Sequence, residues 1–540
     1  MSESARIVMK HWRGWGPNEG ETPKEITSGL RDLLKMLVGD PSPLPLATLN
    51  DILKTVPTSR LVNHALVDTD VESRLRHARG QSFPDWLAMR SGDIHCFPDG
   101  VARPQSTDQV RELLIYAKKN NVRVIPYGGG TSVVGHINPD TAEHPVLTVD
   151  MGAMNSLIHL DEDSHLATFG AGATGPQIEQ QLQQHGFTLG HYPQSWEFST
   201  VGGWVASRSS GQQSLHYGRI EQLFAGAHLE SFVGPLDLPA IPASAAGPDI
   251  REVILGSEGR MGILTEVTLR ISPLPEQEHF KVVFLKSWDA GIALAKQLVQ
   301  QRVALSMLRL SNPLETASQI AMHKNEHGSQ PSVSLGHVMM TFAVTGSVQH
   351  CLGTLSAAHQ MCANHDAIDD TTDMGQQWAA GRFQSPYLRD PLGNSGYAVD
   401  TMETAINWSS VTASAARIER AISDALLDEG ERVLAYSHLS HVYRQGSSIY
   451  TTYVFRLGSS YAQTHERWRK IKSAGASAIV ACGGTISHQH GVGKDHRDYL
   501  GAEKGTLGIA AIHQLCTLFD PQGLMNPGTL VTHNESSDGR

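Results

Sequence analysis

The sequence lacks several features that would place it in a common class at once. No run of about twenty apolar residues occurs, so no membrane-spanning helix is predicted. The first residues, Met-Ser-Glu-Ser-Ala-Arg, have no apolar core and predict no secretory signal. Only five cysteines occur among 540 residues, and none forms a C-x-x-C pair. This usage argues against a disulfide framework and favours a cytoplasmic location.

Positive charge and the common nucleotide-binding motifs are also scarce. Lysine and arginine total 43 against 54 acidic residues, a net charge of −11, so a nucleic-acid partner is not expected. The glycine-rich segments 122–134, 194–210 and 255–264 contain neither a G-x-G-x-x-G turn opening a helix nor a G-x-x-x-x-G-K-[ST] loop. Rossmann and P-loop folds are therefore not predicted.

The most informative segment present is Val122 to Val134, in which a short apolar strand leads into three glycines and two hydroxyl residues. Backbone N–H groups of consecutive glycines can point into one concavity and bind an anionic diphosphate. An ordinary glycine turn is the alternative, because a glycine run alone is a weak motif.

Two more segments, Gln194 to Ser210 and Leu255 to Leu264, also place glycine and small hydroxyl residues between apolar runs. Three such segments far apart in sequence are what a large, extended cofactor needs, whereas a mononucleotide needs only one. A capping box at Ser106 and Gln109 predicts a helix that ends at Asn120-Asn121, and Thr174 with Gln177 predicts another that Gly186 closes. Strands are predicted over Val122 to Pro126, Pro145 to Val149, His165 to Phe169, Ile263 to Ile271, Val433 to Tyr436 and Ser448 to Arg456, with a chain break at Ser272 to Pro275.

Six segments, in the same order, resemble the alkyldihydroxyacetonephosphate synthase family within the flavoproteins of the vanillyl-alcohol-oxidase type. They are Met9 to Gly16, Pro126 to Ser132, Gly190 to Ser210, Gly256 to Ile271, Pro386 to Asp390 and Ser487 to Lys494. The resemblance runs from about residue 9 to about residue 530. It implies an α+β fold, in which a two-subdomain PCMH-type module binds FAD without a covalent bond and an α/β cap binds the substrate.

Four domains are expected on this basis. Residues 1–90 form a helical N-terminal extension, 91–275 the FAD-binding module, 276–495 the cap, and 496–540 a segment that packs on the FAD module. The resemblance implies that the cofactor is bound by Pro126, Tyr127, Gly128, Gly129, Gly130, Thr131, Ser132, Gln194, Ser195, Trp196, Glu197, Phe198, Ser199, Thr200, Ser207, Arg208, Ser209, Ser210, Glu258, Gly259, Arg260, Met261, Gly262, Ile263 and Leu264.

The loop Ser487 to Lys494 contains His488 and His490 two positions apart, and histidine can take and give a proton near neutral pH. A metal site is the alternative, but the nearest further ligands, His438 and His441, are remote in sequence. The resemblance favours proton transfer and no metal. It also shows a departure, because Gln489 stands where that family has a middle histidine, and an amide does not titrate.

Three more residues match functional positions of that family. Tyr443 matches its proton donor or acceptor, although a tyrosine beside a strand is often only packing. Arg389 matches an arginine that contacts the substrate, and its planar fork suits a phosphate monoester. Without the resemblance, Arg389 would be interpreted as an ion pair with Asp390 or Asp400. Arg309 matches an arginine important for activity, which could bind substrate or support the histidine loop.

The resemblance implies exchange of the acyl chain of acyl-dihydroxyacetone phosphate for a fatty alcohol, through an adduct at flavin N5, with His488 or His490 as the base. One alternative is an FAD-linked oxidase or dehydrogenase of a 2-hydroxy acid or an alcohol. Such relatives have Gly-Glu-His-Gly where this chain has His488-Gln489-His490-Gly491. Another is a flavin-binding protein without turnover. A homodimer and peripheral contact with a membrane are in keeping with the resemblance, and the C-terminal Ser-Asp-Gly-Arg is not a peroxisomal address.

Overall fold

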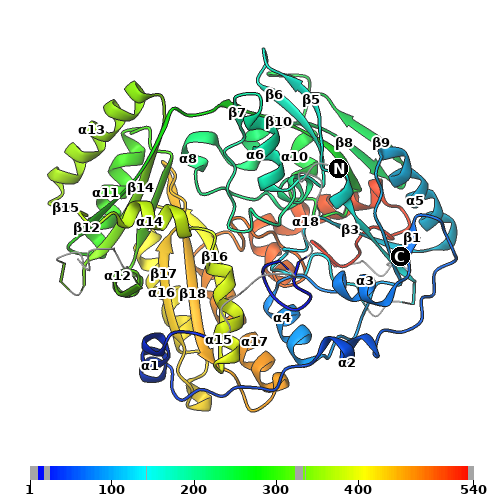
Figure 1. Ribbon diagram of the computed structural model, residues 1–540, viewed down its shortest axis with the longest axis horizontal. Helices are drawn as coiled ribbons and strands as arrows, with labels where there is room; N and C mark the ends of the chain where they lie inside the picture. Colours follow the sequence, from blue (N-terminus) through cyan, green and yellow to red (C-terminus); the bar gives the residue numbers. More distant parts are fainter. Residues whose placement is uncertain (1–9, 18–24, 141–142, 323–332, 335, 533–540) are drawn as a thin grey trace.

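The computed structural model describes residues 10–17, 25–140, 143–322, 333–334 and 336–532. Met9, the first residue of one resembling segment, and the C-terminal Ser-Asp-Gly-Arg lie outside the described residues. The chain forms two bodies of mixed helix and sheet placed side by side, one built from residues before about 275 and one mainly from residues after it (Figure 1).

Two sheets make up the first body. A four-stranded sheet has the order β1-β2-β4-β3, in which β2, β4 and β3 are parallel. Its strands are β1 (Val67–Asp68), β2 (Gly100–Ala102), β3 (Arg123–Tyr127) and β4 (Val146–Asp150). A five-stranded antiparallel sheet has the order β5-β6-β10-β8-β9, with β5 (Leu157–Asp161), β6 (Leu166–Gly170), β8 (Phe224–Ser231), β9 (Gly234–Leu238) and β10 (Ile263–Arg270). Segments remote in sequence are thereby brought together.

Helix α5 (Thr107–Asn120) shows how local sequence positions these strands. The Ser106 hydroxyl accepts a hydrogen bond from Gln109 N, and Asn121 ends the helix in the left-handed conformation with φ 53°. Val110, Leu113, Leu114 and Ala117 are buried on one face, as their spacing predicts. The predicted helix opened by Thr174 is also confirmed as α6 (Gly175–Gln183), although it ends before Gly186.

The chain break predicted at Ser272 to Pro275 does follow the end of β10, but it is not free of regular structure. The break expected at Ser272 to Pro275 begins with a short strand, β11 (Ser272–Pro273), which pairs antiparallel with β7 (Phe187–Thr188). Proline is tolerated there because a strand of a two-stranded pair leaves one edge without a partner strand. The predicted strands at 122–126, 145–149, 165–169 and 263–271 are confirmed as β3, β4, β6 and β10 to within two residues at each end.

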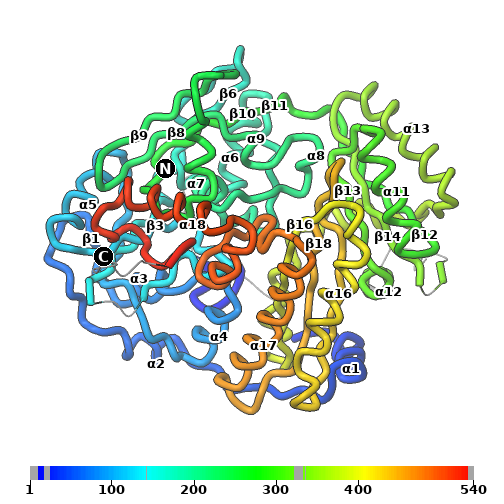
Figure 2. Tube along the Cα trace, turned by 180° about the vertical axis from the view of Figure 1, so that it is seen from behind, coloured from blue at the N-terminus to red at the C-terminus, as the bar shows by residue number. Residues whose placement is uncertain are grey.

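The second body is a seven-stranded antiparallel sheet in the order β15-β12-β14-β13-β17-β18-β16. The strands are β12 (Gln277–Leu285), β13 (Met307–Ser311), β14 (Val338–Gly346), β15 (Ile368–Asp369), β16 (Tyr397–Asn407), β17 (Leu434–Leu439) and β18 (Gly446–Arg456). Helices α11 (Trp288–Gln300), α13 (Val348–Asn364), α16 (Val411–Ser423) and α17 (Tyr461–Ala481) bury their apolar faces on it. Figures 1 and 2 show this arrangement from opposite sides.

The N-terminal part of the chain touches both bodies. Helix α1 (Ser28–Leu37) packs on the second body beside Tyr397 and Val454, whereas α2 (Leu49–Leu53) and α3 (Val71–Arg76) pack next to the first. Helix α4 (Phe83–Ser91) buries Phe83 and Trp86 against β18 and α17. At the other end, α18 (Leu500–Phe519) returns to the core of the five-stranded sheet.

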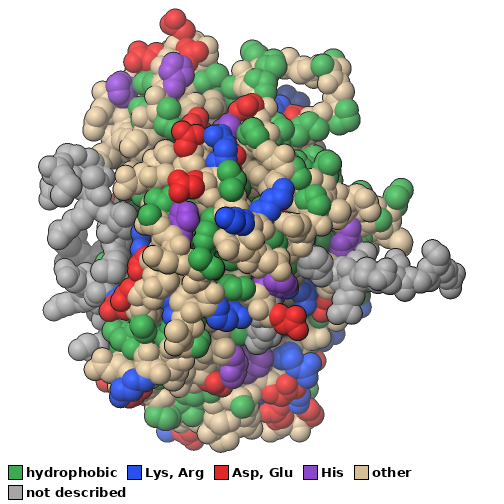
Figure 3. Space-filling model, turned by 90° about the vertical axis from the view of Figure 1, so that its right-hand side faces the viewer, with side chains coloured by type: hydrophobic (Ala, Val, Ile, Leu, Met, Phe, Trp, Pro, Cys, Tyr) green, Lys and Arg blue, Asp and Glu red, His purple; other side chains and the backbone are tan. Residues whose placement is uncertain are grey.

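Several shorter helices complete the described chain: α7 (Val201–Ser207), α8 (Ser214–Tyr217), α9 (Ile220–Leu223), α10 (Arg251–Ile254), α12 (Pro313–Met322), α14 (Met374–Gly381) and α15 (Arg389–Asn394). None of the helices in the described ranges is both long enough and apolar enough to span a bilayer. Acidic and basic side chains are intermixed on the face shown in Figure 3. The α+β fold class predicted from the sequence is confirmed.

Candidate active site

The three glycine-rich segments predicted to share a cofactor do lie together. A Cβ on Gly128 would collide with the Thr200 hydroxyl, and one on Gly129 with the carbonyl oxygen of Phe198. The third segment is adjacent, because a Cβ on Gly259 would come within 3.1 Å of Pro126 Cγ. Glycine is therefore favoured at these positions, because neighbouring backbone or side-chain atoms leave little or no space for a Cβ.

The loop after β3 suits an anionic group. Within the described part of the chain, the amide N–H groups of Gly129, Gly130, Thr131 and Ser132 have no hydrogen-bond acceptor. Unpaired backbone donors in succession bind phosphate oxygens in many proteins. The chain therefore offers a cradle that fits the diphosphate of a dinucleotide such as FAD.

Lys10 adds a cation that the sequence did not lead us to expect here. Its ammonium group donates a hydrogen bond of 2.8 Å to the Gly130 carbonyl, and burial lowers the pKa of Lys10 to about 8. The same N-terminal segment packs Trp15 edge-on against Phe198, with ring centroids 5.4 Å apart. The described residues 10–16 of this motif thus lie beside the glycine loop that follows β3.

Other predicted cofactor residues face the second body. Trp196 stacks on Phe383 with centroids 5.2 Å apart, and Glu197 accepts a hydrogen bond of 3.1 Å from Tyr387. Gln194 donates to the Arg382 carbonyl at 2.8 Å. This segment therefore connects the two bodies as well as approaching the cradle.

The rest of the predicted cofactor set divides between polar contacts and the core. Ser195, Ser199 and Thr200 form the turn and N-cap before α7, Ser207 is the last residue of that helix, and Arg208, Ser209 and Ser210 follow it. Glu258 accepts hydrogen bonds from Val492 N at 2.5 Å and Gly493 N at 2.8 Å. Arg260 donates to the Met525 carbonyl, while Gly262 has a φ of 144° and Met261, Ile263 and Leu264 are buried in the core.

Tyr443 and His488, both predicted as catalytic, are in direct contact. The Tyr443 hydroxyl lies 2.5 Å from His488 Nε2. Tyr443 is held in the turn between β17 and β18, where its N–H donates to the Gly446 carbonyl and its own carbonyl accepts from Trp408 Nε1. Burial raises the pKa of Tyr443, and burial lowers the pKa of His488. At neutral pH both groups are therefore neutral, with the phenol as proton donor and the imidazole as acceptor.

Glu403 on β16 fixes the histidine loop, and the sequence did not single it out. Its carboxylate accepts hydrogen bonds of 2.8 Å from both Gln489 N and His490 N. It also lies 3.3 Å from His490 Nδ1 and 3.8 Å from His488 Nδ1. Although burial opposes ionisation, the two histidines and the loop amides hold the pKa of Glu403 below its usual range. The signal that could have identified Glu403 was an acidic residue in the middle of a strand-forming segment.

Arg219 is the second functional candidate that the sequence did not single out. It precedes α9 in the first body, yet its Nη1 lies 3.0 Å from the Tyr443 hydroxyl and 2.7 Å from His488 Nε2. Its Nη2 donates to the His488 carbonyl at 2.9 Å. Gly218, with φ 94°, makes the turn that directs Arg219 toward the second body.

The two predicted substrate arginines are ion-paired. Arg389 lies 3.3 Å from the Asp400 carboxylate and donates to the Gln81 carbonyl at 2.6 Å. Of the two acids considered, Asp400 is thus the partner, while Asp390 is engaged by Arg90 and Trp86. Arg309 pairs with Glu315 at 2.5 Å, and Glu315 also lies 3.4 Å from His438 Nδ1. His438 stacks on Tyr450, and the rings of Tyr450 and His490 form an edge-to-face pair with centroids 5.9 Å apart.

The alternative of a metal at the histidine loop finds no ligand set. No group of three or more histidine, cysteine or acidic side chains with suitable spacing occurs in the residues that the structure describes. The ring of His441 lies 5.0 Å from that of His488, but its Nε2 is 3.1 Å from the Gly211 carbonyl oxygen. His438 is already engaged, because its Nδ1 lies 3.4 Å from Glu315 and its ring stacks on Tyr450.

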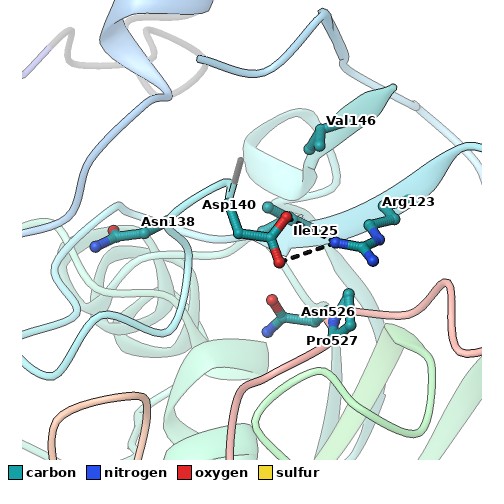
Figure 4. Close-up of a pocket in the computed structure, with 7 residues that line it drawn as sticks. All are labelled: Arg123, Ile125, Asn138, Asp140, Val146, Asn526 and Pro527. Carbon is teal, nitrogen blue, oxygen red and sulfur yellow. Dashed lines mark hydrogen bonds and ion pairs between the residues drawn. The ribbon is translucent and has the colours of Figure 1, made fainter. Parts of the chain in front are cut away.

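A hollow elsewhere on the first body is lined by Arg123, Ile125, Asn138, Asp140, Val146, Asn526 and Pro527 (Figure 4). Arg123 Nη1 donates to both carboxylate oxygens of Asp140, at 2.7 and 2.9 Å. None of the predicted catalytic residues lines this hollow. The active-site candidate is instead the place where the predicted residues Tyr443 and His488 meet Arg219 and Glu403. We name these four side chains the Arg219 cluster.

Comparison with known proteins agrees with this arrangement. An FAD binding domain matches residues 98–229, and the C-terminal domain of FAD linked oxidases matches residues 274–530. Alkyldihydroxyacetonephosphate synthase of Caenorhabditis elegans is 28% identical over 97% of this chain and 89% of its own length. The enzyme of that name from Trypanosoma brucei brucei is 26% identical over 96% of this chain and 92% of its own length.

The chain is a flavoprotein that resembles the alkyldihydroxyacetonephosphate synthases. A solved structure of such a synthase superposes with a TM-score of 0.81 at 24% identity, covering 96% of this chain and 98% of that one. This likeness extends the fold assignment to the whole described chain, including the helices that precede the FAD binding domain. FAD is the cofactor of this flavoprotein, and the cradle after β3 fits its diphosphate.

Proposed function

We propose that this flavoprotein is an FAD-dependent enzyme that exchanges the acyl chain of acyl-dihydroxyacetone phosphate for a fatty alcohol, as in ether-lipid synthesis. The observation that carries the proposal is the hydrogen bond of 2.5 Å between Tyr443 and His488, the two residues that match the catalytic positions of the synthase family. Similarity over nearly the whole chain to proteins named as synthases supports the same substrates.

In this proposal Tyr443 and His488 move the protons. Neutral His488 accepts a proton from C1 of the substrate through the Tyr443 hydroxyl, and the same pair returns it after the alcohol has replaced the carboxylate. The proton lost by the alcohol balances the carboxylic acid that leaves. Bound FAD supplies an electron sink without net redox change, and it is held without a covalent bond.

The remaining roles are part of the same proposal. His490 is the second candidate base, and Glu403 orients both histidines through the loop amides and their Nδ1 atoms. Arg389 binds the substrate phosphate in competition with Asp400, while Arg309 supports the histidine loop through Glu315, His438 and Tyr450. The predicted residues of the three glycine-rich segments bind FAD, with Lys10 beside them.

We further propose the division into domains at residues 90, 275 and 495. Support for the second boundary comes from the end of β10 at Arg270 and the start of β12 at Gln277. Helix α4 runs to Ser91 and argues for a first boundary just after it. A cytoplasmic enzyme that meets its lipid substrates by peripheral contact with membranes, as a homodimer, completes the proposal.

An anaerobic titration tests the proposed function. The purified holoprotein is mixed with acyl-dihydroxyacetone phosphate, and separately with 2-hydroxy acids, while flavin absorbance and released fatty acid are followed. We expect fatty-acid release with bleaching that a fatty alcohol reverses. Reduction of the flavin by a hydroxy acid alone would establish the dehydrogenase alternative instead, and a flavin spectrum that no substrate changes would indicate a protein without turnover.

A further inference from the structure

Arg219 lies between two groups that can exchange a proton, and it comes from the other body of the molecule. The guanidinium group only donates hydrogen bonds, so the Nε2 atom that it faces on His488 must carry a lone pair. The imidazole proton then sits on Nδ1, on the side of Glu403. The Tyr443 hydroxyl accepts from Arg219 and donates its own proton to His488 Nε2.

The charge of Arg219 is directed at these partners. Its Nε faces Glu221 at 2.7 Å, but both Nη atoms reach the cap, where they meet a phenol, an imidazole and the His488 carbonyl. Nη2 also donates to the Arg208 carbonyl of the first body at 3.3 Å. A nearby cation disfavours protonation of an imidazole and favours ionisation of a phenol. Arg219 acts in this direction on His488, His441 and His191, and it opposes the effect of burial on Tyr443.

We propose that Arg219 is a positioning residue that sets the protonation state of the Tyr443–His488 pair, keeping the imidazole neutral and stabilising the phenolate that forms when Tyr443 gives up its proton. No bond other than O–H and N–H is made or broken in this step: the phenol proton moves to His488 Nε2, and the negative charge left on the phenol oxygen is balanced by the guanidinium 3.0 Å away. The inference rests on the proposed function only where turnover is measured.

The charged and titratable groups around the pair act in opposite directions. Glu403 on β16 and His490 on the loop face His488, with Glu403 favouring the imidazolium and His490 opposing it. His441 lies beside the same ring, and Glu221 opposes ionisation of Tyr443. Only Arg219 contacts both members of the pair through one nitrogen atom among the described residues. Its removal therefore changes both titrations in the same direction.

The first test is the pH profile of fatty-acid release by Arg219→Gln. We expect the acidic limb, which needs neutral His488, and the basic limb, which needs protonated Tyr443, both to move to higher pH by about one unit. Arg219→Lys keeps the charge and should keep both limbs while lowering the rate. Arg251→Gln, which removes an arginine paired with Asp249 on the same body, is the matched control and should change neither limb nor rate.

A purely structural role would give a different result. If Arg219 only tied the loop before α9 to the carbonyl groups of His488 and Arg208, the glutamine variant would lose rate or flavin content while both limbs stayed in place. That result would overturn the proposal.

The second test needs no turnover. The ultraviolet difference spectrum of tyrosinate is recorded on holoprotein against pH, and the contribution of Tyr443 is taken as the difference from Tyr443→Phe. We expect Arg219→Gln to raise the pH at which this contribution develops, whether or not the protein acts on ether-lipid precursors. An unchanged midpoint would contradict the proposal, even if the proposed substrates prove correct.

Discussion

Two half-buried arginines, Arg389 and Arg219, illustrate how differently the same side chain can be used. Arg389 is held against the Asp400 carboxylate in what we name the Arg389 cluster, where Tyr453 and Trp468 also donate to Asp400, at 3.1 and 2.8 Å. Arg219 instead places both Nη atoms on the Tyr443–His488 pair and on carbonyl groups. Both arginines have a carboxylate partner, since Glu221 lies 2.7 Å from Arg219 Nε and Asp400 lies 3.3 Å from Arg389 Nη2. The Nη atoms of Arg219, however, also contact two groups that titrate, and a cation in such a position changes their pKa values. Position in a resembling motif did not distinguish these two cases, but the groups that the Nη atoms contact do.

The largest effect expected in the Arg219 cluster follows from removal of the Tyr443 hydroxyl. Tyr443→Phe takes away the hydroxyl that passes a proton to His488 Nε2, and the Arg219 guanidinium at the same nitrogen cannot replace it because it keeps its protons. We expect the rate of fatty-acid release to fall by about 10²–10⁴, the range of a general acid–base residue, with unchanged flavin content. A loss of less than threefold, measured at saturating substrate, would remove Tyr443 from the mechanism.

Glu403 provides the opposite case to Arg219, because it brings a negative charge to the same histidine, His488. Glu403→Gln should destabilise the fold by about 2 kcal/mol, since the carboxylate accepts two buried backbone hydrogen bonds. It should also move the acidic limb of the rate profile to lower pH, opposite to Arg219→Gln. Urea unfolding and the pH profile measure the two effects, and Glu466→Gln, at an exposed ion pair with Arg469, serves as the control.

The depressed pKa of Glu403 has a further consequence for stability. A carboxyl whose pKa is lower in the folded state contributes stability above its unfolded pKa of about 4.3, and this stability is lost as the pH falls toward the folded value. Wild-type protein should therefore lose more stability than Glu403→Gln between pH 5 and pH 3, as an order-of-magnitude window for such a group. Parallel losses in the two proteins would contradict the assignment.

Arg389 should give a smaller and different effect. Arg389→Gln removes a charge-assisted contact with the substrate phosphate, so we expect KM to rise about tenfold, equivalent to about 1.4 kcal/mol. Neither limb of the pH profile should move, because Asp400 already neutralises the arginine. An acyl-dihydroxyacetone without phosphate should be used equally by variant and wild type. A shifted pH profile would show that the two clusters do not differ as described.

Gln489 should have the smallest effect of all. Its side-chain oxygen is buried and has no hydrogen-bond partner among the described residues, and the loop is held through its backbone N–H instead. If His488 is the base, Gln489→His should change the rate by less than about threefold, well below the contribution of a general base. A rise of a hundredfold would assign the essential proton transfer to the middle position of the loop.

The fold was predictable from the sequence where local signals decide it. Three such signals depend only on neighbouring residues, and all three form as expected: the helix cap at Ser106, the helix end at Asn121 and the apolar strand before Gly128. The convergence of the three glycine-rich segments was also predictable, because close backbone approach requires glycine wherever it occurs. The pairing of Ser272–Pro273 with β7 was not, since proline and turn residues ordinarily end a strand.

The active-site candidate was predictable only in part, for a physical reason. Tyr443 and His488 were found through the motifs that they occupy, but Arg219 and Glu403 act through long side chains on elements from different parts of the chain. Neither local periodicity nor spacing indicates which distant group such a side chain will meet. Likewise, the ion pairs of Arg389 and Arg309 depend on partners brought together by the seven-stranded sheet.

The central claim is that the protein exchanges an acyl chain for an alkyl chain without net redox change. The balance of products tests this claim most directly. Holoprotein is incubated with acyl-dihydroxyacetone phosphate and a labelled fatty alcohol, with and without oxygen, and released fatty acid, labelled ether product and hydrogen peroxide are measured. The account predicts equal amounts of fatty acid and ether, the same yield without oxygen, and no peroxide above that of the Tyr443→Phe control. Oxygen-dependent peroxide formation without an ether product would contradict it and assign the protein to the oxidases of this fold.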